Sequence, residues 1–365
     1  ILDIEGELGE RRGKDRMHGS SIEGENFLVG RVEALEVIPN RSIDELLKAM
    51  GKTGFQGRRL SEAVDIITEM ITDEDVTVLM GYAGSLSVAG QWKIIKWFIE
   101  SEYIDILVPT GANISEDIVE AMGHSYYQLE GGDDPYLFRE GYNRYLDLCG
   151  VESDYFEMTS LIAEFICDLV DAEGGNPSMS SREFLRRFGE FLDGRGIDCI
   201  VSAAYRHDVD IFCPAIVDSP YGDAILMAYG RGRRICIDNA ADYIEFMSMA
   251  ERVRETGVIY IGGGVPKDFI QLFAVTPDLM YDRLEVPGRR GLKRRGVKES
   301  FYPHKYAVQI TTDSPQWGGL SGATLEEGIS WGKELIGGRM ATVYCDATIA
   351  LPIIAHAIAE RLGSR

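Results

Sequence analysis

The chain lacks the features that mark membrane, secreted and metal-stabilised proteins. Among its 365 residues there is no run of eighteen apolar residues, and the charged stretch 1–7 does not resemble a signal peptide. Its six cysteines form no C-x-x-C pair, and its five histidines show no metal-ligand spacing. We therefore expect a soluble, cytoplasmic protein with free thiols, no membrane contact and no bound metal.

The chain also has few basic residues for its size. Lys and Arg number 37 against 59 Asp and Glu, which gives a formal net charge of −22. Such a charge repels nucleic-acid phosphates and attracts polycations, so we expect a cationic partner and no nucleic acid. Six Lys and Arg residues in the range 289–298 run against this trend. They form either a solvated insertion that pairs with acidic surface on a neighbouring subunit or a phosphate or acceptor site.

From about residue 76 onward, short apolar runs alternate with amphipathic stretches. Strands are predicted at residues 76–80, 104–108, 197–201, 224–229, 235–237, 258–261, 306–311 and 341–344. Because helices separate most of them, the pattern favours an α/β fold, a Rossmann-like, doubly wound and mostly parallel sheet with helices on both faces. We expect one domain over residues 26–365, a flexible arm at 1–25, and a loop with short helices at 130–155.

Glycines interrupt residues 319–333 and place a Glu, a Trp and a Lys in one short segment. Because each Gly inside a helix costs about 1 kcal/mol relative to Ala, this composition predicts backbone that closely approaches a ligand. Lys333 is the candidate nucleophile, since an unprotonated amine attacks carbonyl or imine carbons. Trp331 offers a ring face to a cation, and Glu327, four residues earlier, offers an anchor for an ammonium group. The alternative is a surface lysine on an ordinary amphipathic helix.

Three strand-to-helix turns, at residues 81–87, 110–113 and 262–264, have the geometry that presents backbone amides to a pyrophosphate. None reads G-x-G-x-x-G, so a tight turn without a ligand remains an alternative at each.

Residues 321–333, with Ser-Gly-Ala, an acidic pair and Ser-Trp-Gly-Lys, closely resemble the active-site segment of deoxyhypusine synthases. Residues 212–223 resemble that family's Pro-Ala-x-x-Asp-(x)3-Gly-Asp motif, and the resemblance extends over roughly residues 70–362. It implies an NAD-dependent enzyme in which Lys333 forms a covalent imine with an aminobutyl group. The implied substrate-binding residues are Asp223, Glu327, Trp331 and Asp268. The implied NAD contacts are Ser85, Ala89, Thr110, Gly111, Glu116, Asp218, Gly263, Thr312, Asp313, Asp346 and Ala347.

Departures from the family pattern cluster in the implied polyamine pocket. Asp268 replaces a histidine, Leu272 replaces an asparagine, and Trp317 and Leu320 stand where two acidic residues are usual. The chain is therefore more similar to a divergent prokaryotic branch of the family.

The resemblance implies spermidine as donor and a lysine of the hypusine-containing translation initiation factor as acceptor. A small amine such as putrescine, the acceptor in related homospermidine synthases, is an alternative. A non-catalytic polyamine or NAD sensor is a third reading. The resemblance also implies a homotetramer with its sites at subunit interfaces.

Overall fold

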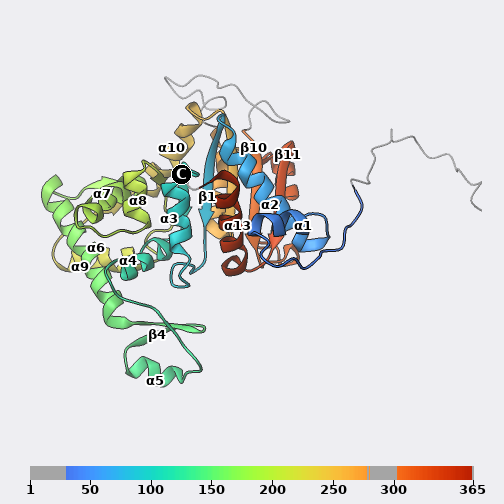
Figure 1. Cartoon of the computed structure of the whole chain (residues 1–365). Helices are drawn as coiled ribbons and strands as arrows, with labels where there is room; N and C mark the ends of the chain where they lie inside the picture. The colour runs from blue at the N-terminus through green and yellow to red at the C-terminus, as the bar shows by residue number, and fades with distance from the viewer. Residues whose placement is uncertain (1–29, 278, 280–301, 364–365) are drawn as a thin grey trace, which may run out of the picture.

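The computed structural model describes residues 30–277, 279 and 302–363, and a six-stranded parallel sheet lies at its centre (Figure 1). The sheet order is β11-β10-β9-β1-β2-β7. These strands are β1 (Val76–Tyr82), β2 (Ile106–Pro109), β7 (Asp210–Ile211), β9 (Glu255–Ile261), β10 (His304–Thr311) and β11 (Glu334–Tyr344). From β1 the chain adds strands in one direction, and from β9 it adds them in the other. This is the order of a doubly wound Rossmann sheet, so the predicted fold class is confirmed.

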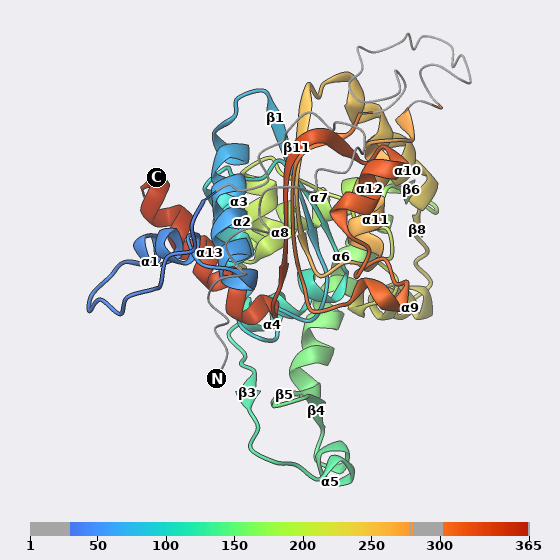
Figure 2. The same ribbon diagram turned by 90° about the vertical axis from the view of Figure 1, so that its right-hand side faces the viewer.

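Helices cover both faces of this sheet, as Figure 2 shows when the sheet is seen nearly edge-on. The longer helices are α1 (Ile43–Met50), α2 (Phe55–Thr72), α3 (Trp92–Glu100), α6 (Glu152–Glu173), α7 (Ser181–Gly194), α9 (Pro220–Gly230), α10 (Asn239–Ser248), α11 (Gly264–Phe273) and α13 (Ala347–Leu362). The shorter ones are α4 (Glu116–Ala121), α5 (Asp134–Arg139), α8 (Ile200–Arg206) and α12 (Leu325–Trp331).

The two faces follow from the two-residue period of the strands. In β1, Met80 packs in a core with α2, α3 and α13, whereas its neighbour Leu79 packs in a second core with α10, α11 and α12. Nearly continuous apolar sequence in the central strands therefore reflects burial on both sides.

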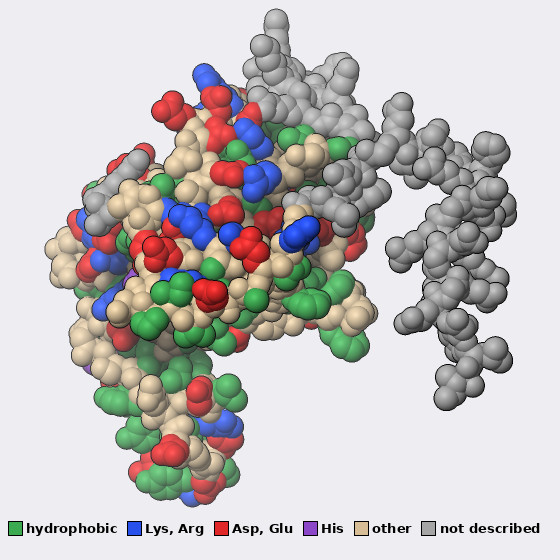
Figure 3. Space-filling model, turned by 45° about the vertical axis from the view of Figure 1, so that its right-hand side comes forward, with side chains coloured by type: hydrophobic (Ala, Val, Ile, Leu, Met, Phe, Trp, Pro, Cys, Tyr) green, Lys and Arg blue, Asp and Glu red, His purple; other side chains and the backbone are tan. Residues whose placement is uncertain are grey.

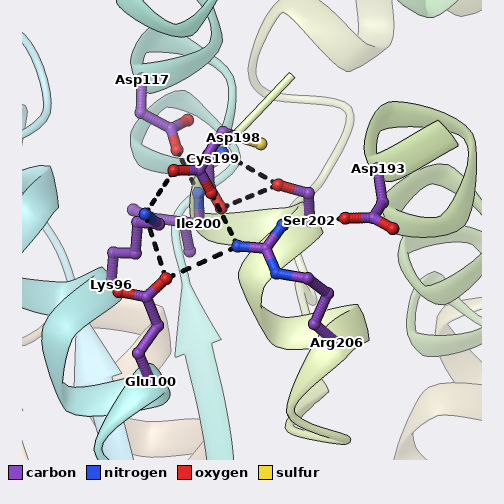
Figure 4. Close-up of polar contacts among 9 residues, drawn as sticks. All are labelled: Lys96, Glu100, Asp117, Asp193, Asp198, Cys199, Ile200, Ser202 and Arg206. Carbon is purple, nitrogen blue, oxygen red and sulfur yellow. Dashed lines mark hydrogen bonds and ion pairs between the residues drawn. The ribbon is translucent and has the colours of Figure 1, made fainter. Parts of the chain in front are cut away.

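Helices α6 to α9 gather beyond the β7 edge of the sheet, and charge pairs join α8 and the residue Asp198 before it to α3 (Figure 4). Lys96 of α3 contacts Asp198 at 2.5 Å, and Arg206 of α8 contacts Asp198 at 2.7 Å. The buried Asp117 accepts a hydrogen bond from the Ile200 amide at 2.7 Å. This bond satisfies a free N–H at the start of α8.

Two predicted strands are wrong. The predicted strand at 197–201 is absent, because α8 begins at Ile200, whose amide donates to the Asp117 carboxylate. Residues 224–229 belong to α9, which begins after the N-cap Ser219 with a proline at its first position. A helix buried on one side and rich in apolar residues cannot be distinguished from a buried strand by composition alone. The short strand β8 (Cys236–Ile237) exists, but it pairs with β6 (Ser178–Met179) outside the main sheet.

Residues 127–151 project from the body as an arm (Figure 1). They contain α5 and an antiparallel sheet of β3 (Tyr127–Gln128), β4 (Tyr142–Tyr145) and β5 (Leu148–Val151), so the expected loop with short helices was only partly right. Hydrophobic side chains gather on the arm (Figure 3), where Phe138 and Leu146 are each 83% exposed.

Some expectations fall outside what the structure covers. The predicted N-terminal arm at 1–25 and the basic stretch at 289–298 lie outside the described residues, and the single domain over 26–365 stays a prediction. Among the residues described, no helix has the length and apolar character needed to cross a membrane.

Candidate active site

A cleft of about 500 Å³ lies at the carboxyl ends of the central strands. It is lined by residues that follow β1, β2, β9, β10 and β11, so it straddles the point between β1 and β9 where the strand order reverses. Parallel α/β sheets bind ligands at this point, because the loops after neighbouring strands diverge there. Its size is that of a typical small-molecule or cofactor site.

The turn after β9 brings backbone close to this cleft. Gly262 and Gly264 have φ angles of 76° and 59°, in the left-handed region that favours glycine. Between them, Gly263 packs so closely on Ser321 that a Cβ would overlap the Ser321 backbone. No side chain caps the start of α11. The turn therefore points an uncapped helix N-terminus at the cleft, an arrangement that binds a pyrophosphate.

Carboxylates, rather than cations, accompany that backbone. Asp218, Asp313 and Asp346 line the cleft, and no Lys or Arg is among the described residues that line it. Asp313 accepts hydrogen bonds from the Ser321 hydroxyl at 2.5 Å and the Ser314 amide at 2.9 Å. Carboxylates at strand ends bind ribose hydroxyls, so backbone for phosphates and carboxylates for sugars together fit a dinucleotide such as NAD.

Of the cofactor residues expected from the sequence, the following line the cleft: Thr110, Asp218, Gly263, Thr312, Asp313, Asp346 and Ala347. The other four lie nearby in the chain but outside its lining. Ser85 donates a hydrogen bond to Glu116 at 3.1 Å, and burial raises the pKa of Glu116 to about 7. Gly111 packs closely on Ser219, where a Cβ would overlap the serine hydroxyl, and Ala89 is half-buried in the turn after β1.

Lys333 follows α12 directly, after Gly332 ends that helix in a left-handed conformation at φ 79°. Its ammonium nitrogen lies 3.1 Å from Gln271 Oε1 and 3.4 Å from Asp268 Oδ1. The same nitrogen lies 5.7 Å from the centre of the Trp331 ring. The side chain is only 13% exposed, so the amine is held in a largely buried pocket at the second turn of α11.

Sequence reasoning missed three buried polar residues beside this pocket: Lys267, Gln271 and Glu334. Lys267 is fully buried and donates to Gln309 Oε1, Leu320 O and Ala323 O at 2.9, 3.1 and 2.6 Å. Burial lowers its pKa to about 8. The available signal was a polar residue in a largely apolar helix and a carboxylate at the start of the edge strand β11, but nothing local showed what these residues contact.

The expected substrate residues fall into two groups. Asp268 and Trp331 contact Lys333, and Glu327 lies one turn before Trp331 on α12, with its side chain exposed. Asp223 is exposed on α9, and no hydrogen bond or ion pair joins it to Lys333 within the described chain. Burial, with smaller contributions from Tyr145, Glu116 and Asp223, raises the pKa of Tyr155, so Asp223 belongs to an acidic and aromatic cluster near Glu116.

Comparisons with known proteins agree on one family. The family model for deoxyhypusine synthase matches residues 45–358. The probable deoxyhypusine synthase 2 of Methanosarcina mazei is 41% identical over 327 residues, covering 89% of this chain and 88% of the relative. A protein of the same name from Archaeoglobus fulgidus is 44% identical over 310 residues, covering 85% and 95%. A crystal structure assigned to a deoxyhypusine synthase of Entamoeba histolytica has a TM-score of 0.58 at 18% identity, covering 87% of this chain and 93% of that one, which supports the fold alone.

Proposed function

The chain belongs to the deoxyhypusine synthase family and is thus a transferase, and we propose that it moves an aminobutyl group from spermidine, with NAD, through an imine on Lys333. The proposed acceptor is a lysine of the hypusine-containing translation initiation factor. The observation that carries this proposal is the Lys333 amine, held 3.1 Å from the neutral Gln271 amide in a largely buried pocket.

Helix α11 connects this amine to the proposed cofactor site. The helix begins at Gly264 in the cleft, and its residues Asp268 and Gln271 contact Lys333. Seven residues along a helix span about 10 Å, which is within the reach of a dinucleotide held at the start of α11, so that the cofactor and Lys333 would act on the same substrate carbon. NAD, when bound in the cleft, would supply the acceptor and later the donor of a hydride at the substrate carbon.

The protein's own chemistry then centres on Lys333. Oxidation at the carbon beside the secondary amine leaves a substrate imine. The Lys333 nitrogen attacks that carbon, and as the new C–N bond forms the bond to the departing propane-1,3-diamine breaks. The incoming acceptor amine repeats the exchange and frees Lys333. Asp268, 3.4 Å from the lysine nitrogen, is the nearest described carboxylate that can hold its proton.

Carboxylates around the two places would hold the ammonium groups of the substrate. Glu327 lies on α12 beside the Lys333 pocket, and Asp223 and Glu116 lie in the acidic and aromatic cluster around Tyr155. Because Trp331 is 64% exposed, one chain alone does not exclude the water that hydrolyses imines. We propose that a second copy covers this face in a homotetramer, and that the enzyme works in the cytoplasm.

A specific observation supports a small-amine acceptor as the second candidate. Beside Lys333 the chain has Asp268, and around the adjoining loop it has Trp317, 77% exposed, and Leu320. A carboxylate in place of a histidine, and apolar groups in place of carboxylates, change where ammonium groups are bound. Transfer to putrescine, as in homospermidine synthases, is thus the alternative. The preserved Lys333 pocket argues against a sensor without catalysis.

Borohydride trapping tests the proposal directly. Incubation with NAD and spermidine, followed by reduction, should add an aminobutyl mass to the peptide that contains Lys333. Lys333→Arg should bind NAD and form no adduct. Lys93→Arg is a matched control, because Lys93 also lies over a tryptophan ring, at 5.3 Å, but is exposed on α3. Adding the initiation factor or putrescine to wild-type enzyme that forms the adduct, without borohydride, then identifies the acceptor by the mass of the product. Normal turnover by Lys333→Arg would refute the mechanism.

A further inference from the structure

Lys333 contacts a neutral amide that is itself held by a buried carboxylate. Lys333 Nζ donates to Gln271 Oε1, and Gln271 Nε2 donates to Glu334 Oε1, each at 3.1 Å. Gln271 is 3% exposed and Glu334 is 2% exposed. The three side chains form a line of hydrogen bonds from the amine, through α11, to the first residue of β11.

The chemistry of the groups fixes the direction of this line. Glu334 Oε1 accepts from the NH₂ group of Gln271, and the Lys333 ammonium group has only donors, so it takes the amide oxygen. The amide oxygen of Gln271 must then face Lys333. Without Glu334, the amide could rotate and present an N–H group to the lysine amine, which would repel the ammonium form and displace it.

The fold makes special room for this carboxylate. Glu334 packs against Gly328 of α12 so closely that a Cβ at residue 328 would overlap the carboxyl group. Its second oxygen, Oε2, is buried without a hydrogen-bond partner among the described residues. A buried polar atom left unpaired costs about 1 to 3 kcal/mol, so packing alone gives no reason to have a glutamate here.

We propose that Gln271 and Glu334 are positioning residues for Lys333: Glu334 orients the Gln271 amide, and Gln271 aims the lysine nitrogen at the substrate carbon. This inference rests on the proposed role of Lys333 as nucleophile. Because Gln271 is uncharged, its contact holds the amine without adding to the long ion pair with Asp268, which favours the unreactive ammonium form. Glu334 acts only through Gln271 and does not touch the substrate.

Two isosteric variants test the pair: Gln271→Met, which removes the amide, and Glu334→Gln, which removes its fixed acceptor. Each should slow formation of the trapped Lys333 adduct by about 10- to 100-fold, as expected for a misplaced nucleophile. The KM for spermidine and the NAD affinity should stay near wild type. Glu326→Gln is the matched control, because Glu326 is an exposed carboxylate on the neighbouring helix that makes no contact in this line.

A second measurement does not depend on polyamine chemistry. Brief acetic anhydride labelling, read by mass spectrometry, should modify Lys333 faster in both variants, since the amine is no longer held inside, while labelling of Lys93 stays constant. The double variant Gln271→Glu with Glu334→Gln restores both hydrogen bonds with the charge moved next to the lysine. In this double variant, acetic anhydride should label Lys333 as slowly as in wild type, because the amine is held again. Adduct formation should stay slow, because the adjacent carboxylate favours the ammonium form.

The outcomes separate this inference from the proposed function. Wild-type labelling and wild-type adduct rates in both single variants would overturn the positioning pair. Failure of the wild-type enzyme to form any adduct with spermidine or a related amine would instead overturn the proposed function, and the labelling contrast would still decide whether the pair holds Lys333.

Discussion

The strand-end cleft and the Lys333 pocket are adjacent, but different parts of the chain form them. The cleft is made of backbone at Gly262–Gly264 and of carboxylates that follow strands, all within one chain. The pocket is made of side chains from α11, α12 and β11, and Trp331 at its rim is 64% exposed. Topology alone can form the first, because parallel strand ends meet at one edge. The second needs tertiary contacts between these elements, and its rim is open in the single chain.

The same contrast is seen between two lysines. All three ammonium hydrogens of Lys267 have acceptors within the chain, and its side chain is fully buried. Lys333 has two such contacts, one of them at 3.4 Å, and remains partly exposed. A lysine whose donors are all satisfied holds structure, whereas one held loosely beside a neutral amide is available for chemistry. Exchanging each for methionine tests this distinction.

The largest expected effect is on catalysis by Lys333→Met. The variant keeps the length of the side chain but has no nucleophile, so the borohydride-trapped adduct should disappear entirely. Its free energy of unfolding should change by only about 1 kcal/mol, because it loses one hydrogen bond to an uncharged group and one long ion pair. Trapping and urea unfolding measure the two quantities. A large loss of stability would make Lys333 a structural residue instead.

Lys267→Met should have the opposite profile. It leaves Gln309 Oε1 and the carbonyl oxygens of Leu320 and Ala323 without their donor in a buried site. Because these buried oxygens would lose a charged hydrogen-bond donor, the free energy of unfolding should fall by about 3 to 5 kcal/mol. Urea unfolding monitored by tryptophan fluorescence measures it, with Lys93→Met as the exposed control. A loss below 1 kcal/mol, on the same scale as surface substitutions, would contradict the structural role.

The cleft could be predicted from the sequence better than the Lys333 pocket could. The strands at 76–80, 258–261 and 306–311 were predicted because apolar runs end in turns, and the turns at 81–87 and 262–264 followed from them. The individual cofactor residues came from the family resemblance instead. The helix at 224–229 was mistaken for a strand because apolar content hides its period. Gln271 and Glu334 could not be found, since they meet only when α11 packs beside β11. The separation of Asp223 from Lys333 was equally invisible, because both motifs are local.

The burial of Glu334 predicts a pH effect on stability. Burial raises its pKa from 4.5 to about 7, so the folded state keeps a proton that the unfolded chain has already lost. Stability therefore falls as pH rises from about 4.5 to 7, and levels off above that. Glu334→Gln removes this dependence, so its stability relative to wild type should increase across this range by up to about 3 kcal/mol. Urea unfolding at a series of pH values checks it, and parallel profiles for the two proteins would contradict it.

The cleft is best tested at its tightest backbone contact. In Gly263→Ala the new methyl group overlaps the Ser321 backbone, so the loop that carries Ser321 must shift. We expect a loss of about 2 kcal/mol in stability from overpacking and a weaker NAD affinity, measured by calorimetry. Gly230→Ala, at the end of α9 with open space around it, is the matched control. Unchanged NAD affinity in Gly263→Ala would place the dinucleotide elsewhere.

The smallest expected effects concern the two carboxylates proposed to bind ammonium groups, Asp223 and Glu327, and they test whether a second copy covers the Lys333 face. In the single chain Asp223 and Glu327 are both exposed, so Asp223→Asn and Glu327→Gln should each weaken spermidine binding by no more than about 1 kcal/mol if the site stays open to solvent. If a second copy buries them, each substitution should instead cost about 2 to 5 kcal/mol. NAD affinity should not change in either case. Calorimetric titration with spermidine distinguishes the two cases, at protein concentrations above and below the one at which sedimentation shows the oligomer dissociating. A loss of binding free energy that grows with assembly supports sites shared between subunits. A small loss at every concentration contradicts them.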